Sequence, residues 1–238
     1  MVQQPEDRHH HITTGNPELD KKMAGGIPEG SLTLIEGQSQ AGKSVLTQQL
    51  VWGALGDGRR VAYYTTENTV HSLLRQMKSL NQDITDFFLC GRVNIYPMRS
   101  APTEDEARAM LRAALDHMTR MTEDRELLAF DSLSVFVTNI PEQETLSFFM
   151  QVKDLCDQNK TLFLTMHSYA FTEAMFIRIR SICDAYLRLR VGEIGTQLLK
   201  EMEVSKVRGA DQGTGNVIAF DVEPGLGMRI IPMTRAKA

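Results

Sequence analysis

The segment that most constrains this chain is GQSQAGKS, residues Gly37–Ser44. It follows an apolar run, SLTLIEG at 31–37, that is typical of a buried strand. It precedes KSVLTQQLVWGAL at 43–55, whose apolar residues have helical spacing. The pattern G-x-x-x-x-G-K-S between a strand and a helix is typical of a phosphate-binding loop, or P-loop. We therefore predict that this loop binds a nucleotide.

The residues of the predicted loop have defined roles. Glycines let the backbone curl so that successive N–H groups face a β-phosphate, and the following helix adds its positive N-terminal end. Lys43 is expected to reach the β- and γ-phosphates, and Ser44 to coordinate Mg²⁺ through its hydroxyl. The alternative is a glycine-rich turn with a solvated lysine. The residues expected to contact the nucleotide are Gly37, Gln38, Ser39, Gln40, Ala41, Gly42, Lys43 and Ser44.

Strands and helices alternate after the loop. Further strands are predicted at 61–67, 92–98, 126–132 and 161–168, and amphipathic helices at 69–80, 102–118 and 143–156. This alternation implies an α/β fold with a mainly parallel central sheet covered by helices on both faces. From residue 184 the sequence changes to alternating residues and glycine-rich turns, which predicts an antiparallel C-terminal extension of the sheet.

Three side chains at the ends of predicted strands are candidates for the chemistry. Asp131 is expected to lie across a Mg²⁺ ion from Ser44, although a strand-end Asp also caps turns. Glu67 ends the 61–67 strand, which we expect beside the P-loop strand, and is the best candidate to orient or deprotonate an attacking water. Its alternative role is that of a carboxylate favoured by a helix dipole. His167 is a candidate γ-phosphate sensor, with a purely structural role as the alternative.

Lys206 and Arg208 form a second group of candidates, far in sequence from the P-loop. They are two residues apart in VSKVRG, so on a strand both side chains leave the same face. A solvated pair is the default interpretation. The other interpretation is a charged finger that reaches the nucleotide of a neighbouring subunit.

Composition narrows the classes of function. Of 238 residues, 42% are hydrophobic, which suits a single domain over 1–238 with a flexible leader at 1–11. The formal net charge is −4 without a run of Lys and Arg, so we expect no nucleic-acid partner. No stretch approaches the roughly 20 apolar residues of a membrane-spanning helix. Membrane association would therefore come only through partners. The 3 cysteines form no CxxC pair and are expected to be reduced.

Four segments together resemble the RecA-like ATPases of the circadian-clock KaiC type. They are GNPELDKKMAGGIPEGSLTLIEGQSQAGKS, YYTTEN, LLAFDS and SKVRGADQGTGNVIAFDVEPGLGMRIIP. The resemblance covers nearly the whole chain as one copy of that domain. It implies a RecA-like P-loop core, ATP as the nucleotide, and a hexameric ring with ATP between subunits. In that family a neighbour's K-x-R-G segment reaches the phosphates, which matches Lys206 to Gly209 here.

Within this superfamily the chain looks most like the FlaH (ArlH) family. The matching segments are ELDKKMAGGIPEGSL, GKSVLTQQ, TTENTVHSLLRQM and DFFLCGRVNIYP. This resemblance implies a cytoplasmic homo-oligomeric ring, peripheral to the membrane, at the base of the archaellum, the archaeal flagellum. The partners it implies are the assembly ATPase FlaI, the membrane platform protein FlaJ and a ring or scaffold protein such as FlaX.

One departure from the clock-type pattern bears on activity. Clock-type members carry two consecutive glutamates after the second strand, whereas this chain has Glu67 followed by Asn68. One carboxylate fewer is then present to activate water. We therefore expect an ATP-binding regulator of the motor, with Mg²⁺, nucleotide-dependent ring assembly and weak or absent hydrolysis.

Three alternatives stay open. An active hexameric ATPase would use Glu67 to polarise water, with Lys206 and Arg208 acting in trans. A recombinase-like DNA-binding ATPase would share the core fold, but fits poorly with the negative net charge. A clock-type autokinase would need a Ser or Thr acceptor, and no residue is marked as one.

Overall fold

The computed structural model describes residues 11–121, 124–194, 197–208 and 215–232. Of the predicted leader only His11 is among them, and it begins the first strand. Residues 1–10 and Gly209 lie outside the described residues. No helix within the described ranges is long and apolar enough to cross a bilayer.

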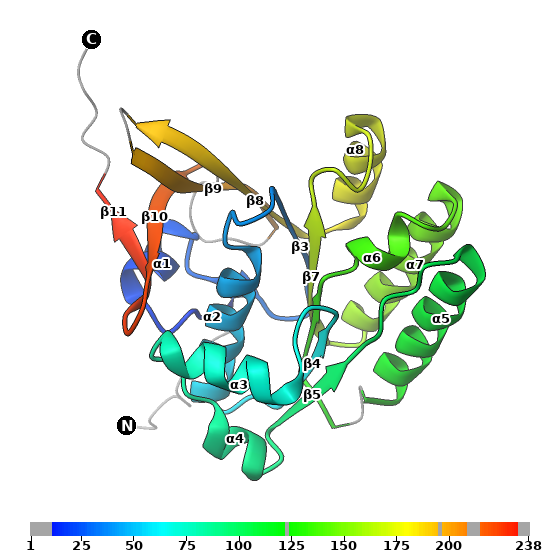
Figure 1. Cartoon of the computed structure of the whole chain (residues 1–238), viewed down its shortest axis with the longest axis horizontal. Coiled ribbons are helices and arrows are strands. Elements are labelled where there is room, and N and C mark those ends of the chain that lie inside the picture. The colour runs from blue at the N-terminus through cyan, green and yellow to red at the C-terminus, as the bar shows by residue number, and fades with distance from the viewer. Residues whose placement is uncertain (1–10, 122–123, 195–196, 209–214, 233–238) are drawn as a thin grey trace, which may run out of the picture.

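A mixed sheet in the order β11-β10-β9-β8-β3-β7-β6-β4-β5 forms the centre of the fold (Figure 1). The strands from β8 to β5 in this order run parallel, whereas β9, β10 and β11 are antiparallel to their neighbours. A separate pair joins β1 (His11–Ile12) to β2 (Ile27–Pro28). The strands of the large sheet are β3 (Leu32–Gly37), β4 (Val61–Thr65), β5 (Val93–Pro97), β6 (Leu127–Asp131), β7 (Thr161–His167), β8 (Ala185–Ile194), β9 (Gln197–Val207), β10 (Val217–Glu223) and β11 (Gly227–Ile231).

Helices cover both faces of the parallel strands (Figure 1). One face packs against α1 (Pro17–Lys22), α2 (Lys43–Gly56), α3 (Val70–Ser79) and α4 (Thr85–Leu89). The other face packs against α5 (Glu104–Met121), α6 (Ser134–Val137), α7 (Glu142–Cys156) and α8 (Glu173–Ile182). Strands β3, β4 and β6 are buried at every position, which explains why they are continuous apolar runs in the sequence. The predicted α/β fold and its antiparallel C-terminal extension are confirmed.

The strand order corrects one expectation. We expected the strand that precedes Glu67, now β4, to lie beside the P-loop strand β3, but β7 and β6 lie between them. The connection from β3 through α2 to β4 skips two strand positions, which are occupied by β7 and β6 later in the sequence. A buried parallel strand has the same apolar pattern whichever strands flank it, so the sequence pattern carries no information on lateral order.

Candidate functional site

The P-loop lies between the end of β3 and the start of α2, at the carboxyl edge of the parallel strands (Figure 1). Gly42 has a φ of +95°, and a Cβ there would lie 3.1 Å from the Phe220 ring, so this position requires glycine. Gln38 anchors the loop to β8, because its N–H donates to Leu189 O at 3.4 Å and its Oε1 accepts from the Val191 N–H at 3.0 Å. The backbone therefore has the compact curve that a phosphate-binding loop needs.

Lys43 points into this curve and is 5% exposed. Its Nζ donates to Gln38 O at 2.8 Å and lies 3.2 Å from Nδ1 of His167. Burial lowers the pKa of Lys43, while the charges of Asp131 and Glu67 act in the opposite direction. The ammonium thus has only neutral acceptors among the described hydrogen bonds, an environment in which an anionic ligand is favoured.

Asp131 is fully buried at the end of β6 and is held by three hydroxyl groups. Its Oδ1 accepts from Ser44 Oγ at 3.2 Å and Thr165 Oγ1 at 2.7 Å, and its Oδ2 accepts from Tyr63 OH at 3.0 Å. Burial and the nearby Asp131 charge raise the pKa of Tyr63, so its hydroxyl stays protonated and donates. The structure therefore brings Asp131 into direct contact with the P-loop serine, whereas their predicted placement on two sides of a Mg²⁺ ion stays a prediction.

These two residues fit a Mg²⁺ ion that arrives with a nucleotide. A hydroxyl and a carboxylate are the oxygen ligands that Mg²⁺ prefers. No group of three or more His, Cys, Asp or Glu side chains suited to a metal occurs in the part of the chain that the structure describes. Phosphate oxygens would have to complete the coordination, which is the usual arrangement in P-loop sites.

Glu67 lies two residues beyond β4 and lines the cavity above the P-loop. The loop that carries it is fixed to the end of β6, because Thr66 Oγ1 donates to Ser132 O at 3.2 Å and accepts from the Ser132 N–H at 3.1 Å. Burial raises the pKa of Glu67, the Asp131 charge adds to this, and Lys43 opposes it. A carboxylate with a raised pKa near the phosphate loop suits the role of a general base.

Asn68, in place of a second glutamate, has a structural role. Its Oδ1 accepts from Ser72 Oγ at 3.0 Å, and its N–H donates to Thr65 Oγ1 at 3.1 Å. Ser72 in turn completes the capping box of α3 with Thr69. The side chain thus holds the serine of the α3 capping box and is not among the residues that line the cavity.

His167 lies between the P-loop lysine and Glu67. The Lys43 ammonium can only donate, so we assign the Nδ1 of His167 as acceptor and the proton to Nε2. Nε2 lies 3.9 Å from Glu67 Oε1, too far for a direct hydrogen bond. Burial and the Lys43 charge lower the pKa of His167, whereas Asp131 opposes this. The exposed ring of Tyr169 stacks on the imidazole, with centroids 4.9 Å apart.

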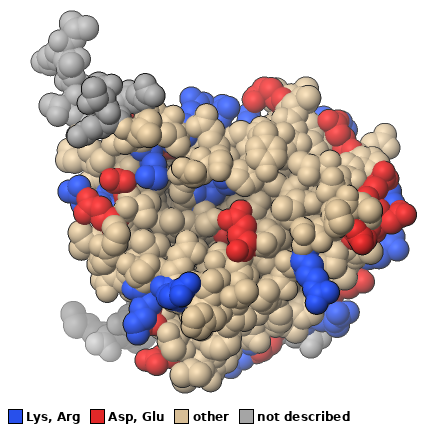
Figure 2. Space-filling model, in the orientation of Figure 1, with Lys and Arg blue, Asp and Glu red and all other residues tan. Residues whose placement is uncertain are grey.

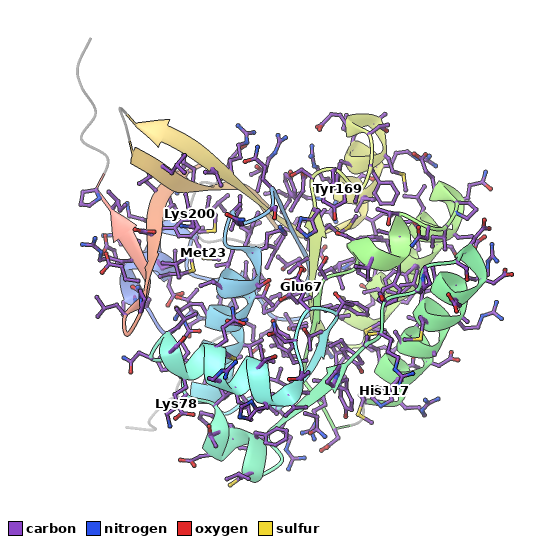
Figure 3. The ribbon with its side chains drawn as sticks, in the orientation of Figure 1. Met23, Glu67, Lys78, His117, Tyr169 and Lys200 are labelled. Carbon is purple, nitrogen blue, oxygen red and sulfur yellow. The ribbon has the colours of Figure 1, made fainter. Side chains whose placement is uncertain are left out.

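A cavity of about 360 Å³ opens above the P-loop. The loop forms its floor, Glu67 and His167 form one wall, and Lys200 and Val222 form another. In Figure 3, Lys200 lies on the β9–β10 side of α2, whereas Glu67 and Tyr169 lie on the other side. Charged side chains on this face are scattered and form no broad basic patch (Figure 2).

Sequence reasoning missed Lys200 and Val222. The side chain of Lys200 lies on the same face of β9 as those of Met202 and Val204, which are both fully buried in the core. A lysine thus occupies a position where the alternation predicts a buried apolar residue. This exception to the pattern was the signal that could have identified Lys200. Val222 carries no signal, because an apolar residue in a strand is the default.

Lys206 and Arg208 lie at the end of β9, beside the start of β8, and thus at the sheet edge opposite to the P-loop. Lys206 Nζ donates to the backbone oxygens of Arg180 and Cys183. Arg208 Nη1 lies 3.5 Å from Asp184 Oδ1. Within one chain the structure does not bring these two cations to Lys43. A role at a nucleotide would need a second copy of the chain.

A glycine-rich loop between a parallel strand and a helix, with its lysine and serine facing a strand-end aspartate, defines a P-loop protein of the RecA-like type. Residues 12–235 match the family described as "ATPase: KaiC". The archaeal flagellar ATP-binding protein FlaH of Sulfolobus acidocaldarius is 32% identical over 95% of this chain and 99% of its own length. The chain belongs to the KaiC-type ATPase family and, within it, to the FlaH family.

Solved structures agree with this assignment. The crystal structure of the flagellar accessory protein FlaH from Methanocaldococcus jannaschii has a TM-score of 0.80 and 26% identity, over 94% of this chain and 99% of that one. A KaiC-like protein from Pyrococcus horikoshii has a TM-score of 0.77 and 20% identity, over 93% of this chain and 99% of that one, and shows the same fold.

Proposed function

We propose that this protein is a single-domain, ATP-binding regulator of the archaeal flagellar motor. The observation that carries ATP binding is the contact of Ser44 Oγ with the buried Asp131 carboxylate, beside an ammonium that has no anionic partner among the described ion pairs. These groups are suited to Mg²⁺ and to the β- and γ-phosphates respectively. Adenine as the base and the role in motility come from the FlaH relatives, which are named as archaeal flagellar ATP-binding proteins.

In this proposal the nucleotide acts mainly as a ligand, with weak or absent hydrolysis. Glu67 is the single carboxylate at its end of the cavity, since Asn68 is bonded to Ser72. The 3.9 Å gap between Glu67 and His167 leaves the Glu67 carboxylate without a direct hydrogen bond from the imidazole that would orient it. Such a site holds ATP well and activates water poorly.

The proposed assembly is a hexameric ring in the cytoplasm, attached to the membrane only through partners. The proposed partners are the assembly ATPase FlaI, the platform protein FlaJ and a ring protein such as FlaX. Family resemblance supports this, together with the positions of Lys206 and Arg208, which are useful to a nucleotide only across a subunit boundary. Nucleotide state would then control ring assembly and partner affinity.

One observation favours a second function, an active ATPase. The raised pKa of Glu67 and its place at the P-loop cavity are those of a general base. Hydrolysis would then drive assembly or switching of the motor, with Arg208 of a neighbouring copy stabilising the transferred phosphate.

A single sample decides between the two functions. Purified protein is incubated with Mg²⁺ and labelled ATP until equilibrium, and bound nucleotide and released phosphate are measured together, with Lys43→Ala as control. Stoichiometric, intact ATP supports the regulator, and multiple turnovers that the control loses support the ATPase. If the parent protein binds no ATP, or binds it as well after Lys43→Ala, the proposed function is wrong.

A further inference from the structure

Lys200 is the second cation that lines the cavity, and it lies on the inner face of β9. The other residues of this stripe, Met202 and Val204, are buried in the core. A lysine at this position can lay its methylene groups along apolar surface while its ammonium stays at the cavity, which Lys200 lines.

The sheet holds this side chain against the P-loop. Lys200 pairs with Phe220, whose ring packs on Gly42, and a Cβ on Gly42 would lie 3.7 Å from Cδ of Lys200. On its other side Lys200 pairs with Val191, whose N–H binds the P-loop residue Gln38. Both strand neighbours of Lys200 therefore contact the loop, and the pairing fixes the position of Lys200 relative to the loop.

The partner of this ammonium is weak. Nζ lies 3.3 Å from Asp221 Oδ1, in a pair whose side chains are 28% and 49% exposed. The same carboxylate oxygen also accepts from the Val222 N–H at 2.8 Å. Ion pairs with this much exposure contribute little, whereas a phosphate is multiply charged and accepts strong, charge-assisted hydrogen bonds. A bound phosphate would therefore compete well with Asp221 for Lys200.

Its place in the cavity indicates which phosphate Lys200 meets. Glu67 and His167 lie beyond Lys43 and mark the end where a γ-phosphate would sit. Lys200 lies on the opposite side of α2 from Glu67 (Figure 3) and, together with Val222, forms the other wall of the cavity. Phosphates that follow the loop from Lys43 toward this wall end with the one attached to the nucleoside.

We propose that Lys200 is a second phosphate-binding lysine, which leaves Asp221 to bind the phosphate nearest the nucleoside. This rests on the proposed nucleotide binding and adds a residue of β9 to that site. Lys200 does not discriminate ATP from ADP, because both carry this phosphate. Asp221 competes with the ligand and lowers its affinity.

The test measures the affinity of Mg-ATP, Mg-ADP and inorganic tripolyphosphate by calorimetry. Lys200→Ala is expected to weaken all three about tenfold, the typical loss for one charge-assisted contact. Asp221→Asn is expected to strengthen ATP binding, but to have no effect when combined with Lys200→Ala. The matched control is Lys78→Ala, since Lys78 also pairs with an aspartate, Asp83 at 3.0 Å, but lies on α3 away from the loop.

Three results would overturn the inference. One is an affinity loss for ATP without a loss for tripolyphosphate, because the lysine would then contact the nucleoside. Another is unchanged affinity after Lys200→Ala while Lys43→Ala abolishes binding, which leaves the proposed function intact. The third is an equal effect of Asp221→Asn in the presence and absence of Lys200. Near-parental affinity of Lys200→Arg, with an unchanged melting temperature of Lys200→Ala, supports a role of charge rather than of folding.

Discussion

At the scale of single residues, the site is organised around a buried ammonium that lacks an anion. Lys43 contacts a backbone oxygen and an imidazole nitrogen, while the Asp131 carboxylate is occupied by Ser44, Thr165 and another hydroxyl. The ammonium and the carboxylate are thus each hydrogen-bonded to neutral groups. A magnesium nucleotide would supply both missing partners at once, because its phosphates suit the lysine and its metal suits the carboxylate.

Glu67→Gln tests the general base. We expect ATP affinity within about twofold of the parent and a loss of any turnover of about 100-fold, the range for removal of a general base. Because the base must be ionised and its pKa is raised above 4.5, turnover of the parent should fall on acidification at a higher pH than for an ordinary glutamate. Phosphate release across pH measures both effects. Equal rates for variant and parent would remove Glu67 from the mechanism.

Asp131→Asn tests the proposed magnesium site. The variant keeps the shape of the side chain but removes the charge that faces Ser44. ATP affinity should no longer depend on Mg²⁺, so values with the ion and with EDTA should converge. Thr165→Val is the control, because it removes one hydrogen bond to Asp131 and leaves its charge. A Mg²⁺ dependence that survives in Asp131→Asn would place the metal elsewhere.

At the scale of elements, the sequence predicts best where local chemistry decides. The strand at 126–132 and the helix at 43–55 appear as β6 and α2 within two residues of their expected ends. Helix α8 was missed, although Thr172 caps it by accepting from the Met175 N–H. Its segment mixes buried Met175 and Phe176 with exposed Ile177, so its apolar pattern is blurred.

The same limit applies to the site. Asp131 and His167 were found because strand ends in a parallel sheet share one edge, which is a rule of topology. Glu67 was identified as a candidate for the same reason, although the predicted position of its strand β4 beside β3 was wrong. Lys200 reaches the cavity only because β9 folds back antiparallel along β8, a pairing between segments that sequence periodicity does not specify.

Two glycines of α2 provide a matched test of packing. A Cβ on Gly53 would lie 2.1 Å from Thr13 O, whereas nothing lies within 4 Å of the equivalent point on Gly56. We expect Gly53→Ala to lower the free energy of unfolding by about 1–3 kcal/mol, as overpacking does. Gly56→Ala should raise it by up to about 1 kcal/mol, because alanine favours a helix. Urea unfolding measures both. A stabilised Gly53→Ala would mean that the 13–14 segment does not pack on α2.

At the scale of the whole molecule, the two ends of the β8–β9 pair lie at opposite edges of the sheet. One end carries Val191 and Lys200 at the chain's own P-loop. The other end carries Lys206 and Arg208 at the opposite sheet edge. In the proposed ring of identical chains, the second end would be the one that reaches a neighbour's nucleotide.

Subunit mixing tests this sharing. Lys43→Ala removes the P-loop lysine and Arg208→Ala removes the exposed arginine, so each variant alone should lose nucleotide-dependent assembly or turnover. A mixture should regain part of it, because some boundaries combine an intact P-loop with an intact arginine. Assembly by light scattering and phosphate release measure the recovery. A mixture that behaves as the average of its two components would show that Arg208 does not act across a boundary.

The hydrogen bond from the Val191 N–H to Gln38 couples the position of the P-loop to the β8–β9 pair, which also lines the site. The ten residues of β8 span about 33 Å, and strand pairing along them makes the unit stiff. β3 pairs with β8 only over Ala185–Leu189, so a small shift of the P-loop on phosphate binding would act on the part of β8 beyond Leu189. The Val191 end of the pair would then follow the P-loop, while the end beside Lys206 stays fixed to the parallel core through β3.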